Sequence, residues 1–225
     1  MVDPREKYAE GEMILIDKFY QWTSFDVVKK VRNTVGVKKV GHAGTLDPLA
    51  TGLLIVCTGK MTRKIQDYQD MPKEYQGAFF LGATRPSFDK ETPVDSQADI
   101  QHITPEKIIE TAGTFTGEIE QVPPVFSAIR KEGKRGYEFA REGKHVDLEP
   151  RKVRIFRFEI TRVELPLIQF ELVCSKGFYV RSLARDFGQK LGCGAYLEEL
   201  RRTAIGNFRV DSAMTIDEFV HSVRT

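Results

Sequence analysis

Two long stretches in the second half of the chain alternate apolar and polar residues, and they constrain the fold more than any other feature of the sequence. KVRIFRFEITRVEL (152–165) and LIQFELVCS (167–175) read as two strands joined by a turn at Pro166. Further strands are expected at GEMILIDK (11–18), LLIVC (53–57) and EYQGAFFLG (74–82). Because the expected strands outnumber the helices and neighbour each other in hairpin order, we predict an α+β fold with a mainly antiparallel sheet.

Helices are expected between and after these strands. We place the N-cap of a helix through DVVKKVRNTV (26–35) at Ser24, and the cap of a later helix at Thr104. TIDEFVHSV (215–223) begins with the residue spacing of a capping box. The remaining expected helices are KMTRKIQDYQ (60–69), YEFARE (137–142) and the amphipathic SKGFYVRSLARDFGQKLG (175–192).

The chain has 225 residues, which is long enough for one large domain or two small ones. No linker rich in Gly, Ser or Pro divides it, so we expect a single domain over residues 1–225. No apolar run approaches the roughly 18 residues that a membrane span needs, and the polar start of the chain resembles no signal or transit peptide. Cys57, Cys174 and Cys193 form no CxxC pair, which favours reduced thiols, a cytoplasmic location and no metal site.

The formal net charge of +2 conceals an uneven distribution of charge. Residues 128–157 contain ten Lys or Arg and five acids, so this segment is basic and the rest of the chain is mildly acidic. The segment is either a solvated loop and helix or a surface for phosphate groups, since Lys and Arg supply most of the affinity for nucleic acid.

The stretch GHAGTLDPLATG (41–52) holds a lone carboxylate, because Asp47 is the only acid between Asp26 and Asp67. Asp47 is either part of a common Asp-Pro turn or a nucleophile toward a sugar C1′ or an electron-poor ring carbon. No second acid is placed for glycosidase chemistry, and no HExxH, GxSxG or P-loop pattern is present. Any reaction is therefore expected to need no cofactor and no metal.

Three other residues are candidates with an ordinary structural alternative. Arg181 is either a snorkelling arginine at a helix edge or a guanidinium that holds an active carboxylate ionised. Tyr75 is either a core aromatic of a strand or a ring that contacts a ligand. His42 offers a flat ring that could stack or donate a hydrogen bond.

Four ordered blocks resemble the bacterial TruB family of tRNA pseudouridine synthases over residues 11 to 216, nearly the whole chain. They are GHAGTLDPLATGLL, KEYQG with LGATRPSFDKETP, VPPVFSAIRKEGKRGYEFAREG, and CSKGFYVRSLARDFGQKLGCGAYLEELRRTAIGNF. The resemblance implies the pseudouridine-synthase catalytic fold, a mainly antiparallel mixed sheet flanked by helices, with a basic insertion at about 124–152 that clamps RNA.

The resemblance also implies the reaction. A uridine of the tRNA T-arm, conventionally uridine 55, would be flipped out, cleaved from its sugar at N1 and rejoined through C5. Asp47 would be the nucleophile, and attack on C1′, attack on C6 and formation of a glycal are all open routes. Tyr75 would stack on the flipped base and help to move the C5 proton. Arg181 would pair with Asp47 and with Asp89.

The remaining implied roles concern RNA binding. Tyr179 and Leu200 would line the base pocket, and Arg63 would contact phosphate. His42 would fill the space that the flipped nucleotide vacates in the T-loop. The implied partner is the T-arm stem-loop of tRNA, bound by a cytoplasmic monomer without a guide RNA or a membrane.

Several positions depart from the family pattern. Residues 85–87 are Arg, Pro and Ser where relatives have a TDT triad, and Thr92 stands where glycine is usual, so loop 84–92 is expected to run differently. KFYQ (18–21) replaces the KPxG turn. The chain also stops after the TIDEF helix, where many relatives continue into an RNA-binding PUA-like module, and we expect a larger Michaelis constant for that reason.

Two other functions compete with this one. The first is an RNA-binding helper that assists tRNA folding without catalysis. The second is a member of the guide-RNA-dependent branch of the same superfamily, which works with partner proteins. The set of Asp47, Tyr75 and Arg181 favours an enzyme over the helper, because a protein that only binds RNA needs no lone acid beside phosphates. The guide-RNA-dependent branch normally carries the C-terminal module, and the wording of GHAGTLDPLATG resembles the bacterial branch instead.

Overall fold

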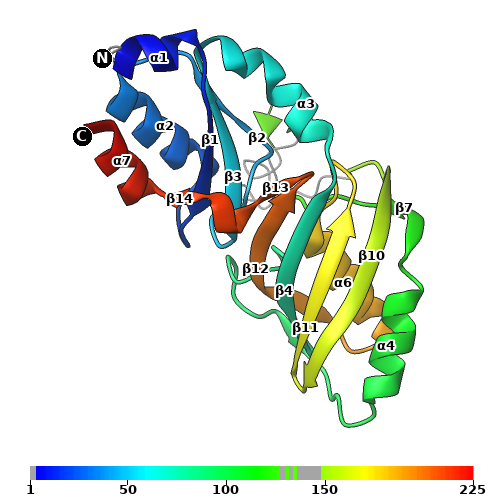
Figure 1. The fold of residues 1–225 in the computed structure, drawn as a ribbon. Coiled ribbons are helices and arrows are strands. Elements are labelled where there is room, and N and C mark those ends of the chain that lie inside the picture. Colours follow the sequence, from blue (N-terminus) through cyan, green and yellow to red (C-terminus); the bar gives the residue numbers. More distant parts are fainter. Residues whose placement is uncertain (1–3, 127–129, 132–133, 136–147, 225) are drawn as a thin grey trace. The chain divides into compact units, whose positions relative to one another are not determined.

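The computed structural model describes residues 4–126, 130–131, 134–135 and 148–224 (Figure 1). They fall into two compact units, which we call unit 1 (Met1–Gln76 and Leu200–Thr225) and unit 2 (Gly77–Glu199). Strands β4 (Lys73–Leu81) and β12 (Ala195–Ile205) each contribute residues to both units. Our expectation of one domain over residues 1–225 stays a prediction.

Unit 1 is built on the strand order β14-β1-β3-β12, with β2 on β3 and β13 on β12. Strand β1 runs antiparallel to β3, whereas β14 runs parallel to β1, and β12 runs parallel to β3. The elements are α1 (Pro4–Glu10), β1 (Met13–Lys18), α2 (Ser24–Val35), β2 (Val40–Ala43), β3 (Thr51–Thr58), η1 (Gly59–Lys64), α3 (Ile65–Asp70), β13 (Phe208–Arg209), η2 (Val210–Ser212), β14 (Met214–Thr215) and α7 (Ile216–Arg224).

Helix α2 begins one residue earlier than the sequence suggested. Its N-cap is Thr23, not Ser24, because the Thr23 hydroxyl accepts the backbone N–H of Asp26 while the Asp26 carboxylate accepts the backbone N–H of Thr23. This reciprocal pair is a capping box. Ser24 is the first helical residue and is buried, which frees its hydroxyl for a tertiary contact described below.

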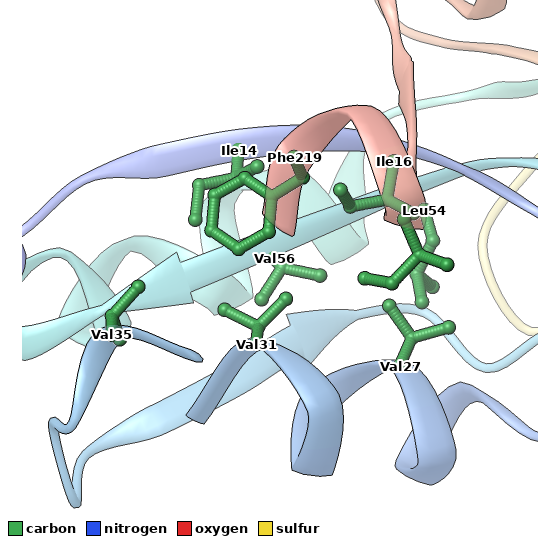
Figure 2. Close-up of a cluster of buried hydrophobic side chains, with 9 residues drawn as sticks. Ile14, Ile16, Val27, Val31, Val35, Leu54, Val56 and Phe219 are labelled. Carbon is green, nitrogen blue, oxygen red and sulfur yellow. The ribbon is translucent and has the colours of Figure 1, made fainter. Parts of the chain in front are cut away.

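A cluster of buried hydrophobic side chains holds the helices of unit 1 on its strands (Figure 2). Val27, Val31 and Val35 recur on one face of α2, as a helix that buries one side requires. They pack with residues of β1, β3 and α7, namely Ile14, Ile16, Leu54, Val56, Ile216 and Phe219. Each fully buried Val, Leu or Ile side chain contributes roughly 1.5–3 kcal/mol.

Unit 2 contains the predicted hairpin of the second half. Strands β10 (Arg151–Glu164) and β11 (Leu167–Cys174) pair antiparallel, and β7 (Gly117–Gln121) pairs antiparallel with β10, so the strand order is β4-β11-β10-β7. The other elements are β5 (Ala83–Thr84), β6 (Ser96–Gln97), α4 (Pro105–Gly113), β8 (Arg130–Lys131), β9 (Lys134–Arg135) and α6 (Val180–Leu191).

Five phenylalanines fill the core of unit 2. Phe79, Phe158 and Phe170 project from β4, β10 and β11, and their ring centroids lie 4.3–6.2 Å apart. Phe187 of α6 lies 5.8 Å from both Phe79 and Phe158, so α6 packs on the face that these strands present (Figure 1). Phe115, just beyond α4, adds the fifth ring. The α+β class and the mainly antiparallel sheet are thus confirmed.

Two expectations depend on residues outside this description. The basic insertion at about 124–152 and the helix at 137–142 fall largely or wholly on residues that the structure does not describe; only the short pair β8–β9 is placed between residues 127 and 147. Within the described residues, no helix is long and apolar enough to cross a membrane.

Candidate active site

Asp47 lies in the tight loop between β2 and β3 of unit 1. Its backbone carbonyl accepts a hydrogen bond from Ala50 N at 3.1 Å, which closes a turn with Pro48 inside it. The glycines at the two ends of the loop, Gly44 and Gly52, have φ angles of 85° and 101°, a region that favours glycine. At Gly52 a Cβ would also collide with the backbone of Arg202 on the neighbouring strand.

The buried side chain of Arg202 ties β12 to this loop. It donates from Nε to the carbonyl of Leu53 at 2.8 Å and from an Nη atom to the carbonyl of Gly44 at 3.0 Å. The fully buried guanidinium therefore bonds to the backbone around Asp47 rather than to a carboxylate. Such charge-assisted bonds fix the loop more strongly than neutral ones.

Ser24, the first residue of α2, and Lys18, the last residue of β1, hold the middle of the loop. Ser24 Oγ accepts Leu46 N–H at 2.8 Å and donates to the Leu46 carbonyl at 3.2 Å. Lys18 Nζ donates to the carbonyls of Trp22 (2.7 Å) and Pro48 (3.3 Å). Asp47 is thus flanked on both sides by backbone that side chains from β1 and α2 hold in place.

Buried cations set the electrostatics of this loop. Burial lowers the pKa of Lys18 to about 8, the attraction of Asp47 opposes this shift, and Arg202 adds to it. Burial also lowers the pKa of His42, and Arg202 lowers it further, so the His42 imidazole is uncharged at neutral pH. Positive charge from buried side chains therefore acts on the loop that carries Asp47.

The other candidates of unit 1 come from separate elements. His42 lies on β2 and is half-buried, Tyr75 lies on β4 and is buried, and Leu200 lies on β12 and is buried. Arg63 lies in η1 and is exposed.

In unit 2 the structure brings Arg181 and Asp89 together. Arg181 Nε lies 3.6 Å from Asp89 Oδ2, and both side chains are buried. An Nη atom of Arg181 also donates to the carbonyl of Ser87 at 3.4 Å. The pairing of Arg181 with Asp47, which would link the two units, stays a prediction.

Tyr179 immediately precedes α6 and is held by a side chain that sequence reasoning missed. The buried amide of Gln121 accepts Tyr179 N–H at 2.8 Å and donates to the Tyr179 carbonyl at 3.1 Å. Both backbone groups of Tyr179 are therefore satisfied by one residue 58 positions away. The only local signal was a polar residue directly before the Val-Pro-Pro breaker.

The divergent loop 84–92 has its own hydrogen-bond network. Ser87 and Thr92 exchange backbone and hydroxyl bonds at 2.8–3.2 Å, and the Arg85 guanidinium donates to the Thr92 carbonyl at 2.5 Å. Arg85 also lies 4.5 Å from the centroid of the Tyr196 ring. Arg85, Ser87 and Thr92 thus bond to one another in the segment that carries Asp89.

Metal-ligating side chains and thiols are the remaining reactive groups of the described residues. Among those residues, no group of three or more His, Cys, Asp or Glu is arranged to hold a metal ion. The three cysteines are buried and form no disulfide with one another, and burial raises the pKa of Cys57 to about 11, which suppresses the reactive thiolate.

Comparison with known families gives two matches that together cover residues 32–224. Residues 32–180 match the TruB family pseudouridylate synthase N-terminal domain, and residues 181–224 match the tRNA pseudouridylate synthase B C-terminal domain. The chain is 51% identical to tRNA pseudouridine synthase B of Flavobacterium johnsoniae, over 97% of this chain and 99% of that protein. It is 47% identical to the protein of the same name from Phocaeicola vulgatus, over 94% of this chain and 93% of that protein.

Solved structures give a similar result. A chain from a Cbf5–Nop10–Gar1 complex superposes with a TM-score of 0.75 at 30% identity, covering 97% of this chain and 56% of that one. A chain from an H/ACA RNP bound to a substrate RNA containing 2′-deoxyuridine gives 0.71 at 27% identity, covering 98% and 58%. This chain therefore spans little more than half of those solved chains.

Proposed function

Because the chain belongs to the TruB family of pseudouridylate synthases, we infer that it is a tRNA pseudouridine synthase, an isomerase that converts uridine to pseudouridine. The observation that carries this conclusion is 51% identity, over nearly the whole of both chains, with a relative that bears that name. Its substrate class is tRNA, and the target is the T-arm uridine at position 55.

The reaction rearranges one uridine without adding or removing atoms. The bond between N1 and C1′ breaks, a bond between C5 and C1′ forms, C5 loses its proton and N1 gains one. The uracil must rotate while it is detached, so the nucleotide has to leave the RNA stack and enter a closed pocket. Asp47 is the nucleophile in this proposal, and attack on C1′, attack on C6 and formation of a glycal all satisfy the same balance.

The surroundings of Asp47 support that role. The carboxylate lies on a loop whose carbonyls are bound by Lys18 and Arg202, so its backbone is already ordered before RNA arrives. Asp47 also interacts electrostatically with buried Lys18, which brings positive charge to the loop. Because no other acid occurs between Asp26 and Asp67, this stretch adds little repulsion against RNA phosphates.

The other site residues take the roles that the family resemblance implies. Arg181, buried with Asp89, orients Asp47, and Tyr75 stacks on the flipped base and helps to remove the C5 proton. Tyr179 and Leu200 line the base pocket. His42, being uncharged, fills the space left in the T-loop, and Arg63 contacts phosphate.

The partner and location follow from this substrate. The enzyme binds the tRNA T-arm directly as a cytoplasmic monomer, with no cofactor and no guide RNA. Some solved relatives belong to complexes with Nop10 and Gar1, but the relatives at 45–51% identity bear the name tRNA pseudouridine synthase B.

Release of tritium from tRNA that carries it at C5 of its uridines tests this function. Wild type should release tritium and Asp47→Asn should not, with a single modified position in the T-loop after carbodiimide treatment and primer extension. Asp67→Asn, an exposed acid of α3, is the matched control and should behave as wild type. A folded wild type that binds tRNA without releasing tritium would refute the enzyme and favour the RNA-binding helper.

A further inference from the structure

A pocket of ≈340 Å³ lies on unit 1, between the turn that follows β1 and the exposed side of α2. It is lined by Gln21, Trp22, Asp26, Lys29, Lys30 and Asn33. The four residues from α2 recur at spacings of three and four, so they share one side of the helix. We propose that this pocket binds an unpaired nucleotide of the RNA substrate, with its base on Trp22 and its phosphate on Lys29 and Lys30.

Trp22 offers a ring that is held in place from behind. It is half-buried and packs against the hydrophobic cluster of unit 1, while Phe19 contacts it edge-on with centroids 6.5 Å apart. Around it, Phe19, Tyr20 and Phe25 are 40%, 46% and 60% exposed. Aromatic rings on the surface are what RNA-binding proteins use to stack unpaired bases, because every base has a π face.

The charge around the pocket suits a phosphate. Residues 18–39 contain six Lys or Arg and a single acid, Asp26. The Asp26 carboxylate is already engaged in the helix cap, since it accepts from the backbone N–H and the hydroxyl of Thr23 at 2.9 and 2.5 Å. Lys29 and Lys30 are exposed and supply the positive charge, and the amides of Gln21 and Asn33 can donate to and accept from a base edge.

The pocket is joined to the loop that carries Asp47. Gln21 N–H donates to the Pro48 carbonyl at 2.8 Å, and Lys18 Nζ bonds to the carbonyls of both Trp22 and Pro48. A nucleotide on Trp22 therefore lies a short distance along unit 1 from the proposed nucleophile, and it belongs to the same RNA molecule. This inference rests on the proposed function, because it adds a contact for the tRNA that Asp47 modifies.

Trp22 also reports on its own occupancy, since it is the only tryptophan of the chain. Unmodified tRNA should quench its fluorescence in a saturable way in the full-length Asp47→Asn protein, which forms no product. Lys29→Gln combined with Lys30→Gln should raise the Kd at least fivefold and flatten the dependence of log Kd on log salt by about 1–2. Lys38→Gln with Lys39→Gln removes the same charge from exposed residues outside the pocket and should change the Kd by less than about twofold.

Substitutions of Trp22 separate stacking from charge. Trp22→Leu keeps apolar contact with the core but removes the π face, so filter binding should show a Kd about 5- to 100-fold higher. Trp22→Phe should restore most of the affinity, and circular dichroism verifies that each variant is folded. Wild-type affinity in Trp22→Leu, or equal losses in the two lysine pairs, would overturn the proposal.

The activity of the wild-type protein is scored separately. Pseudouridine formation without quenching of Trp22 fluorescence by tRNA would refute the pocket as an RNA-binding site and leave the proposed function intact. Quenching and pocket-specific loss of affinity without pseudouridine formation would keep the pocket as an RNA site and refute the proposed function.

Discussion

Replacement of Arg202 by methionine tests whether the loop around Asp47 depends on a buried guanidinium. Methionine keeps much of the apolar volume but removes the bonds to the carbonyls of Leu53 and Gly44, at 2.8 and 3.0 Å. Hydrogen bonds to charged groups contribute roughly 1.5–3 kcal/mol each, so two of them amount to about 3–6 kcal/mol. The substitution also removes the unfavourable free energy of burying the charged guanidinium, which offsets part of this loss. We therefore expect the free energy of unfolding to fall by about 2–4 kcal/mol.

The neighbouring Arg201 is the control for this experiment. It lies on the same strand, is half-exposed, and pairs with Asp17 through N–O distances of 2.6 and 3.0 Å. An ion pair in contact with solvent contributes roughly 0–1 kcal/mol, so Arg201→Met should cost much less. Urea denaturation followed by far-UV circular dichroism gives both values. Equal losses in the two variants would refute the argument that Arg202 bonds hold the loop.

Three further predictions concern the backbone, the pH dependence and the base pocket. Gln21 has a φ of 66°, a region that favours glycine, so Gln21→Gly should raise the free energy of unfolding by about 0.5–1 kcal/mol, measured by urea denaturation; a loss would contradict it. Because the pKa of Lys18 is about 8 in the folded protein and about 10.5 when unfolded, the unfolded chain binds more protons between these values. The stability of wild type relative to Lys18→Met should therefore rise from pH 8 to pH 10.5, and a flat difference in chemical denaturation would refute the shift. Gln121→Leu should lower kcat/KM about tenfold or more through misplacement of Tyr179, whereas exposed Gln101→Leu should leave it unchanged.

Much of the fold could be predicted because its signals are local. The hairpin of β10 and β11 shows in the alternation of residues 152–175, and the cap at Thr104 needs only the residues beside it. The N-cap of α2 was misplaced by one residue because Thr23 and Ser24 are both good caps, although Asp26 lies three residues after Thr23, at the spacing of a capping box.

The supports of the site could not be predicted in the same way. Lys18, Gln121 and Arg202 each bind backbone carbonyls or amides that lie 30 to 158 positions away in the sequence. Every residue offers a backbone carbonyl, whatever its side chain, so the sequence does not mark the partner in such a contact. Neither a pair of opposite charges nor a motif predicts it. By contrast, Asp47 stood out because a lone acid among glycines is visible without any knowledge of the fold.

The two glycines on either side of the Asp47 loop, Gly44 and Gly52, differ in the substitutions that they tolerate. This difference decides which of the two positions can be varied in a mutant library. At Gly44 an added Cβ would meet nothing closer than 3.6 Å, so only its φ of 85° restricts the residue, and asparagine or aspartate is the natural replacement. At Gly52 the backbone of Arg202 occupies the space itself. A saturation library at Gly44 should therefore return a few functional alleles, whereas a library at Gly52 should return the parent sequence alone.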